Sequence, residues 1–143
     1  MIKVICGGKR NAGWAGDGIG EYEKRLKKPF NVEFEFYEEE KLAKFLEKWP
    51  FSGNDYVILC DERGENISSI DFSQKLEKCF MNSKNVVIVV GGAFGVTDEV
   101  REKANFVWSF SKLVFPHMLF RLMLTEQIYR AMEIVNGSKY HHE

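Results

Sequence analysis

Short apolar runs alternate with longer amphipathic stretches along this chain, and this alternation predicts its architecture. The apolar runs are typical of strands buried in a parallel sheet, and the amphipathic stretches are typical of the helices that connect such strands. Strands are expected at residues 2–6, 32–37, 55–60, 85–90 and 105–110. Helices are expected at residues 14–27, 41–49, 69–80, from 97 onward and from 116 to 135. The pattern predicts one α/β domain over residues 1–143, with a mostly parallel sheet flanked by helices.

Individual segments refine this arrangement. Residues 85–90 (NVVIVV) form the most apolar strand, which we expect at the sheet centre, whereas residues 32–37 alternate and should leave one face wet. Ser68 and Asp71 have the spacing of a capping box at a helix start. Pro116 suits the first position of the last helix. That helix carries an apolar stripe for packing, formed by Phe120, Leu124, Ile128, Met132 and Val135.

Composition limits the possible functions. The 143 residues are 45% hydrophobic and 29% charged, as in a globular domain that buries a core. Because 20 basic residues meet 21 acidic ones, a globally basic nucleic-acid binder is excluded, whereas a local basic face is not. Residues 1–28 carry seven lysines and arginines against three acids, and residues 33–40 carry five glutamates. An ordinary solvated face is the commoner explanation of such clusters.

The spacing of the cysteines and the length of the apolar runs bear on where in the cell the protein is expected. Cys6, Cys60 and Cys79 show no C-x-x-C spacing, which favours reduced thiols over disulfides or a zinc site. The first residues lack the pattern of a signal peptide, and the longest apolar run, residues 86–90, is far short of a membrane span. We therefore expect a cytoplasmic protein with no metal site and no membrane segment.

Two segments are candidates for ligand binding. Residues 91–95 (GGAFG) follow the most apolar strand, where glycines let backbone amides approach a ligand, although a structural turn would use them equally well. The dinucleotide-binding G-x-G-x-x-G and the phosphate loop are both absent. Residues 108–117 (WSFSKLVFPH) offer hydroxyls and an apolar wall without paired carboxylates or a metal cluster. That composition suits a cleft for an adenosine-like ligand, or simply a strand and loop that enter a helix.

The three histidines are His117, His141 and His142, all in the last 27 residues. Histidine suits proton handling or phosphate contact. The tail of residues 140–143 (YHHE) is otherwise a frayed terminus or the stub of a tag, or it gains a catalytic role by crossing to a second subunit. On the last helix, Arg121 lies where it can meet an anion, whereas Glu126 and Arg130 have the spacing of a simple ion pair.

Taken together, these segments resemble one known family closely. VVGGAFG at residues 89–95, WSFSKLVFPHMLFRLMLTEQIYRA at residues 108–131 and the terminal YHHE have the order and spacing of the SPOUT-class methyltransferases. Within that class the chain resembles the ribosomal RNA large subunit methyltransferase H family. The resemblance covers the whole chain, including MIKVICGGKR at its start and LCDERGENISS at residues 59–69.

The resemblance implies a homodimer, and a deep trefoil knot in which the C-terminal segment threads through the loop before it. It also implies S-adenosylmethionine as the methyl donor. The contacts that it assigns to this donor are Leu59, Gly91, Phe110, Ser111, Lys112, Leu113, Val114 and Phe115. The implied substrate is a pseudouridine in a stem-loop of 23S ribosomal RNA, methylated at N3 on the assembled ribosome. Such a transfer needs no metal, because the donor is activated and positioning supplies most of the rate.

The resemblance also suggests roles for single residues. Tyr140, His141 and His142 are expected to reach across the dimer to the RNA, with His141 as the candidate for proton removal. Arg121 is expected to contact the RNA or the donor's carboxylate, and His117 to orient its turn. His142 stands where the family usually has a cation, and an imidazole lacks the fixed donors of arginine. The RNA contact there is expected to be weaker or pH-dependent.

Two rival functions remain open at this level. The first is a non-catalytic module that binds RNA or the ribosome and has kept the fold, although the intact loops for the donor argue against it. The second is a nucleotide-dependent oxidoreductase on a doubly wound sheet, which the missing G-x-G-x-x-G argues against. Binding of S-adenosylmethionine or of NAD would separate these rivals from a methyltransferase.

Overall fold

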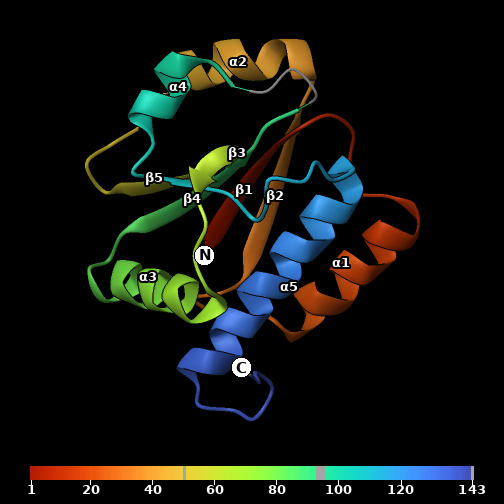
Figure 1. Cartoon of the computed structure of the whole chain (residues 1–143), viewed down its shortest axis with the longest axis vertical. Coiled ribbons are helices and arrows are strands. Elements are labelled where there is room, and N and C mark those ends of the chain that lie inside the picture. The colour runs from red at the N-terminus through yellow and green to blue at the C-terminus, as the bar shows by residue number, and fades with distance from the viewer. Residues whose placement is uncertain (50, 93–95, 143) are drawn as a thin grey trace.

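The computed structural model describes residues 1–49, 51–92 and 96–142, which form a five-stranded sheet with helices on both faces (Figure 1). The elements follow in the order β1 (Ile2–Gly7), α1 (Gly13–Arg25), β2 (Val32–Tyr37), α2 (Glu39–Lys48), β3 (Asp55–Glu65), α3 (Ser69–Met81), β4 (Asn85–Val90), α4 (Asp98–Lys103), β5 (Phe106–Trp108) and α5 (His117–Val135). The strand order is β2-β1-β4-β3-β5, and each neighbouring pair of these strands is parallel. The expected α/β class is therefore confirmed.

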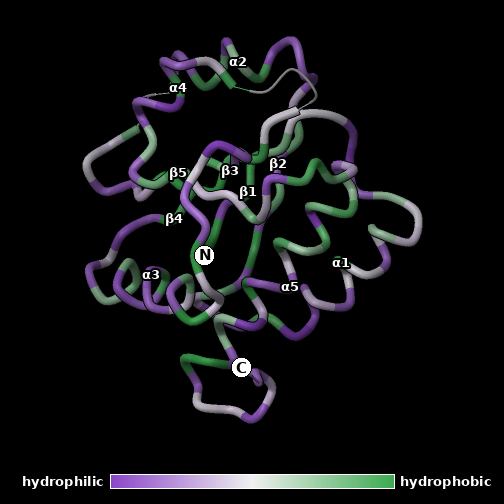
Figure 2. The backbone as a smooth tube through the Cα atoms, viewed as in Figure 1, coloured by the Kyte–Doolittle hydropathy of each residue, from purple (hydrophilic) through white to green (hydrophobic). Residues whose placement is uncertain are grey.

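Each face of the sheet has its own apolar cluster. Helices α1, α3 and α5 cover one face, where Leu76 and Ile128 pack against strand residues such as Ile88. Helices α2 and α4 cover the other face through Leu46 and Val100. Figure 2 shows hydrophobic residues along the central strands and hydrophilic ones over much of α2 and α4. The result is a three-layer arrangement that buries the sheet on both sides.

Strand β4 lies at the sheet centre, as its sequence predicts. Its last five residues are buried, and they alternate between the two apolar clusters. The predicted capping box at the start of α3 is also confirmed. The Ser68 hydroxyl accepts the Asp71 amide at 3.0 Å, and the Asp71 carboxylate accepts the Ser68 amide at 3.4 Å.

Two of the expected strand boundaries were wrong. The strand expected at residues 55–60 continues to Glu65, and the one expected at residues 105–110 is shortened to Phe106–Trp108. Trp108 pairs with both Cys60 and Glu65, so residues 61–64 bulge out of the ladder. These residues are polar and have no strand periodicity, so the pattern of hydrophobic positions did not indicate an extension.

The helix boundaries differ by one or two residues. α1 ends at Arg25 because Leu26 is already extended, and α2 begins at Glu39, where acidic side chains face the positive end of the helix. Pro116 precedes α5 as its cap, since its ψ of 142° is extended, and does not occupy the first helical position. The Thr97 hydroxyl accepts the Val100 amide at the start of α4.

Helix α5 packs through its apolar stripe, as expected. Leu124, Ile128 and Met132 are buried, and Phe120 and Val135 are partly buried against the same cluster. The helix also packs against α1 and α3. Strand order and pairing do not test whether the C-terminal segment threads through a loop, so the trefoil knot stays a prediction.

The loops at the carboxyl ends of the strands diverge. The chain leaves β1 toward α1 on one face of the sheet, whereas it leaves β4 toward α4 on the other face (Figure 1). In open parallel sheets, a crevice for a ligand forms where neighbouring connections diverge in this way. A ligand site is therefore expected at the carboxyl ends of β1, β3 and β4.

Candidate functional site

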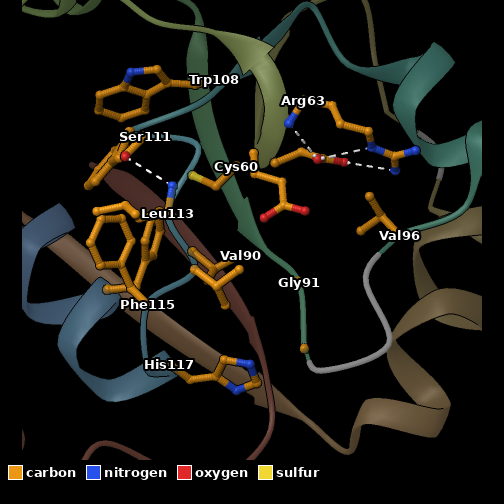
Figure 3. Close-up of a pocket in the computed structure, with 16 residues that line it drawn as sticks. Cys60, Arg63, Val90, Gly91, Val96, Trp108, Ser111, Leu113, Phe115 and His117 are labelled. Carbon is orange, nitrogen blue, oxygen red and sulfur yellow. Dashed lines mark hydrogen bonds and ion pairs between the residues drawn. The ribbon is translucent and has the colours of Figure 1, made fainter.

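A pocket of about 560 Å³ lies at this carboxyl edge (Figure 3). Most of its lining comes from three segments that are far apart in the sequence, residues 60–63, 90–92 and 108–120. The volume is within the range of roughly 300–1,000 Å³ that is usual for small-molecule sites. Several expected donor contacts meet here, namely Gly91, Phe110, Ser111, Leu113, Val114 and Phe115.

One side of the pocket is aromatic and aliphatic. The Trp108 ring stacks on Phe72 with 4.2 Å between centroids, and it meets the edge of Phe110 at 4.5 Å. These contacts continue the packed core into the wall of the pocket. Leu113 and Val114 are 70% and 83% exposed, which is unusual for aliphatic side chains beside a cavity. This side suits a flat apolar group such as a nucleobase.

Hydrogen bonds fix the shape of the loop that follows β5. The Ser109 hydroxyl donates to the Ser111 carbonyl at 3.0 Å, and the Ser111 hydroxyl accepts the Leu113 amide at 3.0 Å. From the β3–α3 connection, the Asn66 amide donates to the carbonyls of Ser109 and Phe110, both at 3.0 Å. The small hydroxyls singled out in the sequence therefore shape the backbone at the pocket wall.

The other side of the pocket is charged and was missed by sequence reasoning. Asp61, Glu62 and Arg63 line it from the bulge in β3. Asp61 forms ion pairs with Arg63 at 3.3 Å and with Arg101 of α4 at 3.0 Å. A charged tripeptide directly after a buried strand was the signal in the sequence that could have indicated this wall.

Two expected contacts, Leu59 and Lys112, are placed differently. Leu59 does not line the pocket, because its side chain is fully buried under α2 and α4, whereas its neighbour Cys60 does line it. Lys112 is exposed and lies outside the lining. Of the glycine-rich loop 91–95, residues 93–95 lie outside the described residues. Contact of any of these positions with a cofactor stays a prediction.

His117 begins α5 at the lower edge of the pocket in Figure 3. Its Nδ1 lies 3.9 Å from Oε1 of Glu39, which begins α2. A Cβ on Gly92 would come within 2.8 Å of Glu39, so glycine allows this close approach. The contact joins the start of α5 to the start of α2 on the opposite face of the sheet. The expected role of His117 in orienting its turn stays a prediction.

Arg121 does not line the pocket. Its side chain is 1% exposed, and the guanidinium donates to the carbonyls of Gly7 at 2.9 Å and Lys9 at 2.7 Å. It also donates to the side chain of Asn11 at 3.2 Å, and lies 5.2 Å from the centre of the Phe36 ring. In this structure Arg121 therefore holds the loop after β1, and its expected contact with RNA or donor stays a prediction.

The C-terminal tail folds back on α5 of its own chain. The Tyr140 hydroxyl donates to Glu126 at 3.1 Å, and His141 Nδ1 lies 3.0 Å from Arg130. Glu126 and Arg130 form the ion pair that their spacing predicts, at 2.7 Å. Burial and the adjacent Glu126 carboxylate raise the pKa of Tyr140 to about 12, so its phenol remains a donor at neutral pH.

The distance along α5 separates the tail from the pocket. His117 lines the pocket and Arg130 meets the tail, and the thirteen helical steps from one to the other span about 20 Å. Neither Tyr140, His141 nor His142 lines the pocket of this chain. The structure therefore brings six of the eight expected donor contacts to one pocket and leaves Tyr140, His141 and His142 at another place.

Two thiols lie near the site in unreactive surroundings. Burial raises the pKa of Cys6 to about 12, against the opposing effect of Arg121, and burial also raises the pKa of Cys60 far above its usual range. Both side chains are thus protonated thiols at neutral pH. All three cysteines are free.

The described part of the chain has neither a cluster of metal ligands nor a membrane-spanning helix. Residues 1–49, 51–92 and 96–142 contain no group of three His, Cys, Asp or Glu side chains arranged to hold a metal ion. Within the same ranges, no helix has the length and apolar content needed to cross a membrane.

Comparison with known proteins identifies the family. Residues 1–141 match the family described as "Predicted SPOUT methyltransferase". Proteins named "Ribosomal RNA large subunit methyltransferase H" are 39% identical in Caldicellulosiruptor bescii and 38% identical in Parabacteroides distasonis, and each alignment covers 99% of both chains. The one from Clostridium botulinum is 36% identical, with 98% of each chain covered.

A solved structure supports the fold. A probable methylase family protein from Haemophilus influenzae Rd KW20 superposes with a TM-score of 0.54 over 97% of this chain and 67% of that one, at 14% identity. The family match extends over nearly the whole length, and several relatives exceed 30% identity. The chain therefore belongs to the SPOUT methyltransferase family.

Proposed function

We propose that this protein transfers a methyl group from S-adenosylmethionine to N3 of a pseudouridine in the RNA of the large ribosomal subunit. SPOUT methyltransferases use this donor, and the relatives are named as methyltransferases of large-subunit RNA. The observation that carries the proposal is the pocket at the carboxyl edge of the sheet, with one aromatic side and one charged side. A non-catalytic module would have no need of such a pocket.

The residues present fit the donor. The adenine would lie against the side formed by Trp108, Phe110 and Leu113, where a flat apolar ring is well accommodated. The backbone of Gly91 and of the loop after β5 offers hydrogen-bonding groups for the adenine edge and the ribose. The bound donor would supply an activated methyl group on a sulfonium. The chain then has to position that group, exclude water and handle one proton.

The proton on N3 of the target base has to leave when the new carbon–nitrogen bond forms. His141 is our candidate to take it, because an imidazole accepts a proton near neutral pH. Tyr140 and His142 would orient the base or contact its phosphates. This tail lies about 20 Å along α5 from the pocket of its own chain. At that distance it would act at the pocket of another copy of the chain.

A second copy of the chain can supply what one copy lacks. We propose a homodimer in which the tail of one protomer reaches the pocket of the other, since two-fold pairing creates two equivalent composite sites. The deep trefoil knot is part of the same proposal, because threading would hold the loop after β5 in place at the pocket.

Two groups of exposed cations, one at each end of α1, are available for the RNA. Lys9 and Arg10 are exposed on the loop after β1, and the end of α1 adds Lys24, Arg25, Lys27 and Lys28, also exposed. Contacts of such cations with phosphates would position the substrate and weaken as salt rises. An RNA substrate in the assembled ribosome would place the protein in the cytoplasm.

The function is tested by mapping ribosomal RNA from cells that lack the gene. Mass spectrometry should show the loss of one methyl group on a single pseudouridine of 23S RNA. Purified protein with labelled S-adenosylmethionine should restore that methyl on intact ribosomes. Unchanged RNA in the deletion strain, or purified protein that binds no S-adenosylmethionine, would contradict the proposal.

The composite site is tested by mixing two inactive variants. Gly91→Trp would block the pocket and His141→Ala would disable the tail. If each site combines the pocket of one protomer with the tail of the other, random mixing restores about a quarter of the wild-type activity. If both parts act within one chain, the mixture stays inactive, and the cross-subunit arrangement is wrong.

A further inference from the structure

The two sides of the pocket differ in chemistry. Leu113, Phe115 and Trp108 lie on one side in Figure 3, and Arg63 lies on the opposite side, with Gly91 below it on that side. A ligand that fills this pocket therefore needs a flat apolar end and a charged end. The charged side has no role yet in the proposed function.

The charged side is built on a carboxylate that is mostly, though not fully, buried. Asp61 accepts the backbone amide of Arg63 at 3.0 Å, its Nε at 3.4 Å and its Nη2 at 3.3 Å, and also accepts Nη2 of Arg101 at 3.0 Å. The Asp61 side chain is only 9% exposed, whereas that of Arg63 is 63% exposed. Asp61 thus has its acceptor sites filled, and it holds the Arg63 guanidinium in place at the pocket.

Arg63 and Glu62 keep free groups on this side. Nη1 of Arg63 donates to no acceptor within the described ranges, so it retains two N–H groups. The Glu62 side chain is exposed and lines the pocket, and its carboxylate has no hydrogen bond or ion pair with any described residue. Glu62 therefore offers a free negatively charged acceptor, and Arg63 offers a free positively charged donor. The two residues are neighbours in the sequence and line the same end of the pocket.

We propose that Glu62 and Arg63 bind the amino-acid end of the methyl donor. Glu62 accepts from the α-ammonium group, and Arg63 donates from Nη1 to the α-carboxylate. This inference rests on the proposed function, which supplies the donor. With the adenine on the aromatic side, the charged end of the donor stays out of the apolar half, where its desolvation would be costly. Glu62 and Arg63 thus distinguish the donor from nucleosides that lack an amino-acid end.

The exposure of the Glu62 and Arg63 side chains limits how much each can contribute to donor binding. Charge-assisted hydrogen bonds are strong, but solvent screens pairs between exposed groups. We therefore expect the loss of either side chain to weaken donor binding about three- to tenfold. The effect should decrease at high salt.

Calorimetric titration with three ligands tests this inference. At its amino-acid end S-adenosylmethionine has both charged groups, and its decarboxylated form keeps the ammonium but loses the carboxylate. 5′-Methylthioadenosine lacks both of these groups and also the sulfonium charge. Glu62→Gln should weaken the first two ligands and leave methylthioadenosine unchanged. Arg63→Gln should weaken S-adenosylmethionine alone. Glu65→Gln, an exposed residue of the same strand outside the pocket, is the control and should change none of them.

The outcomes separate the two proposals. If Glu62→Gln and Arg63→Gln bind S-adenosylmethionine as wild type does, the assignment is wrong while the proposed function stands. Equal weakening of S-adenosylmethionine and methylthioadenosine would also overturn it, because the variants would then have distorted the whole pocket. If the wild-type protein binds none of the three ligands, the proposed function itself fails. Thermal unfolding of each variant checks that the Asp61 contacts still hold the bulge.

Discussion

Arg121 joins the start of α5 to the loop that leaves β1. Its buried guanidinium donates to two backbone carbonyls and one side-chain oxygen of residues 7–11. The planar fork of arginine reaches several acceptors at once, which the single ammonium group of lysine cannot do. The exposed cations Lys9 and Arg10 of the proposed RNA surface lie on the loop that Arg121 holds.

Replacing this arginine should therefore destabilise the fold. We expect Arg121→Lys to lower the free energy of unfolding by about 2 kcal/mol, since buried carbonyls lose charge-assisted hydrogen bonds. Urea unfolding followed by circular dichroism measures the change. Arg25→Lys, at an exposed arginine, should stay within about 0.5 kcal/mol of wild type. Equal stability of the two variants would contradict this role for Arg121.

The buried thiol of Cys6 makes stability depend on alkaline pH. Burial raises its pKa from 9.0 to about 12, so the unfolded chain releases this proton at a lower pH than the folded chain. The folded state then binds more protons above pH 9, and stability falls as the pH rises toward 12. Between pH 8 and 10, wild type should lose about 1.4 kcal/mol more than Cys6→Ala. Parallel losses in the two proteins would show that another group is responsible.

At the scale of elements, the bulge between β3 and β5 shapes the charged side of the pocket. Trp108 pairs with Cys60 and again with Glu65, which pushes residues 61–64 out of the ladder. Gly64 lies where a Cβ would come within 2.5 Å of the Val107 carbonyl oxygen. Glycine is required here because the two backbones approach closely.

Filling this position should disturb both stability and the site. We expect Gly64→Ala to cost about 2 kcal/mol, because a backbone carbonyl cannot move aside without breaking the β3–β5 pairing. It should also weaken donor binding, since residues 61–63 move with the bulge. Gly53→Ala is a matched control, because a Cβ there would meet nothing within 4 Å. Denaturant unfolding and calorimetry with S-adenosylmethionine measure the two effects. Wild-type stability and affinity in Gly64→Ala would contradict the close approach.

For the whole molecule, the pocket is formed by the packing of distant segments. Its walls come from β3, β4, the loop after β5 and the start of α5, so a ligand that fills it bridges all of them. Such a ligand binds the folded chain and not the unfolded one. Its binding free energy therefore adds to the stability of the fold.

Thermal unfolding with the donor tests this coupling. At about 100 times its dissociation constant, S-adenosylmethionine adds about 2.7 kcal/mol of stability. For a chain of 143 residues, this should raise Tm by about 8 °C. NAD at the same concentration should cause no shift, and a shift with NAD alone would favour the oxidoreductase. Absence of any shift with S-adenosylmethionine would contradict the pocket assignment.

Local patterns predicted the elements well where the cause is local. The apolar run in β4 and the Ser68–Asp71 capping box depend on residues close in the chain, and both are confirmed. The bulge in β3 could not be predicted, because it depends on pairing with Trp108, more than forty residues later. The burial of Arg121 was also missed, since its acceptors lie 110 to 114 residues earlier.

The amino-acid sequence alone determined the α/β class, the succession of strands and helices, and, through its motifs, the family. These properties are local or directly encoded in residue order. Only the tertiary structure decided that a charged wall faces an aromatic one, and that the tail lies away from the pocket. Strand order, register and the length of α5 set those positions, and none of them is a property of neighbouring residues.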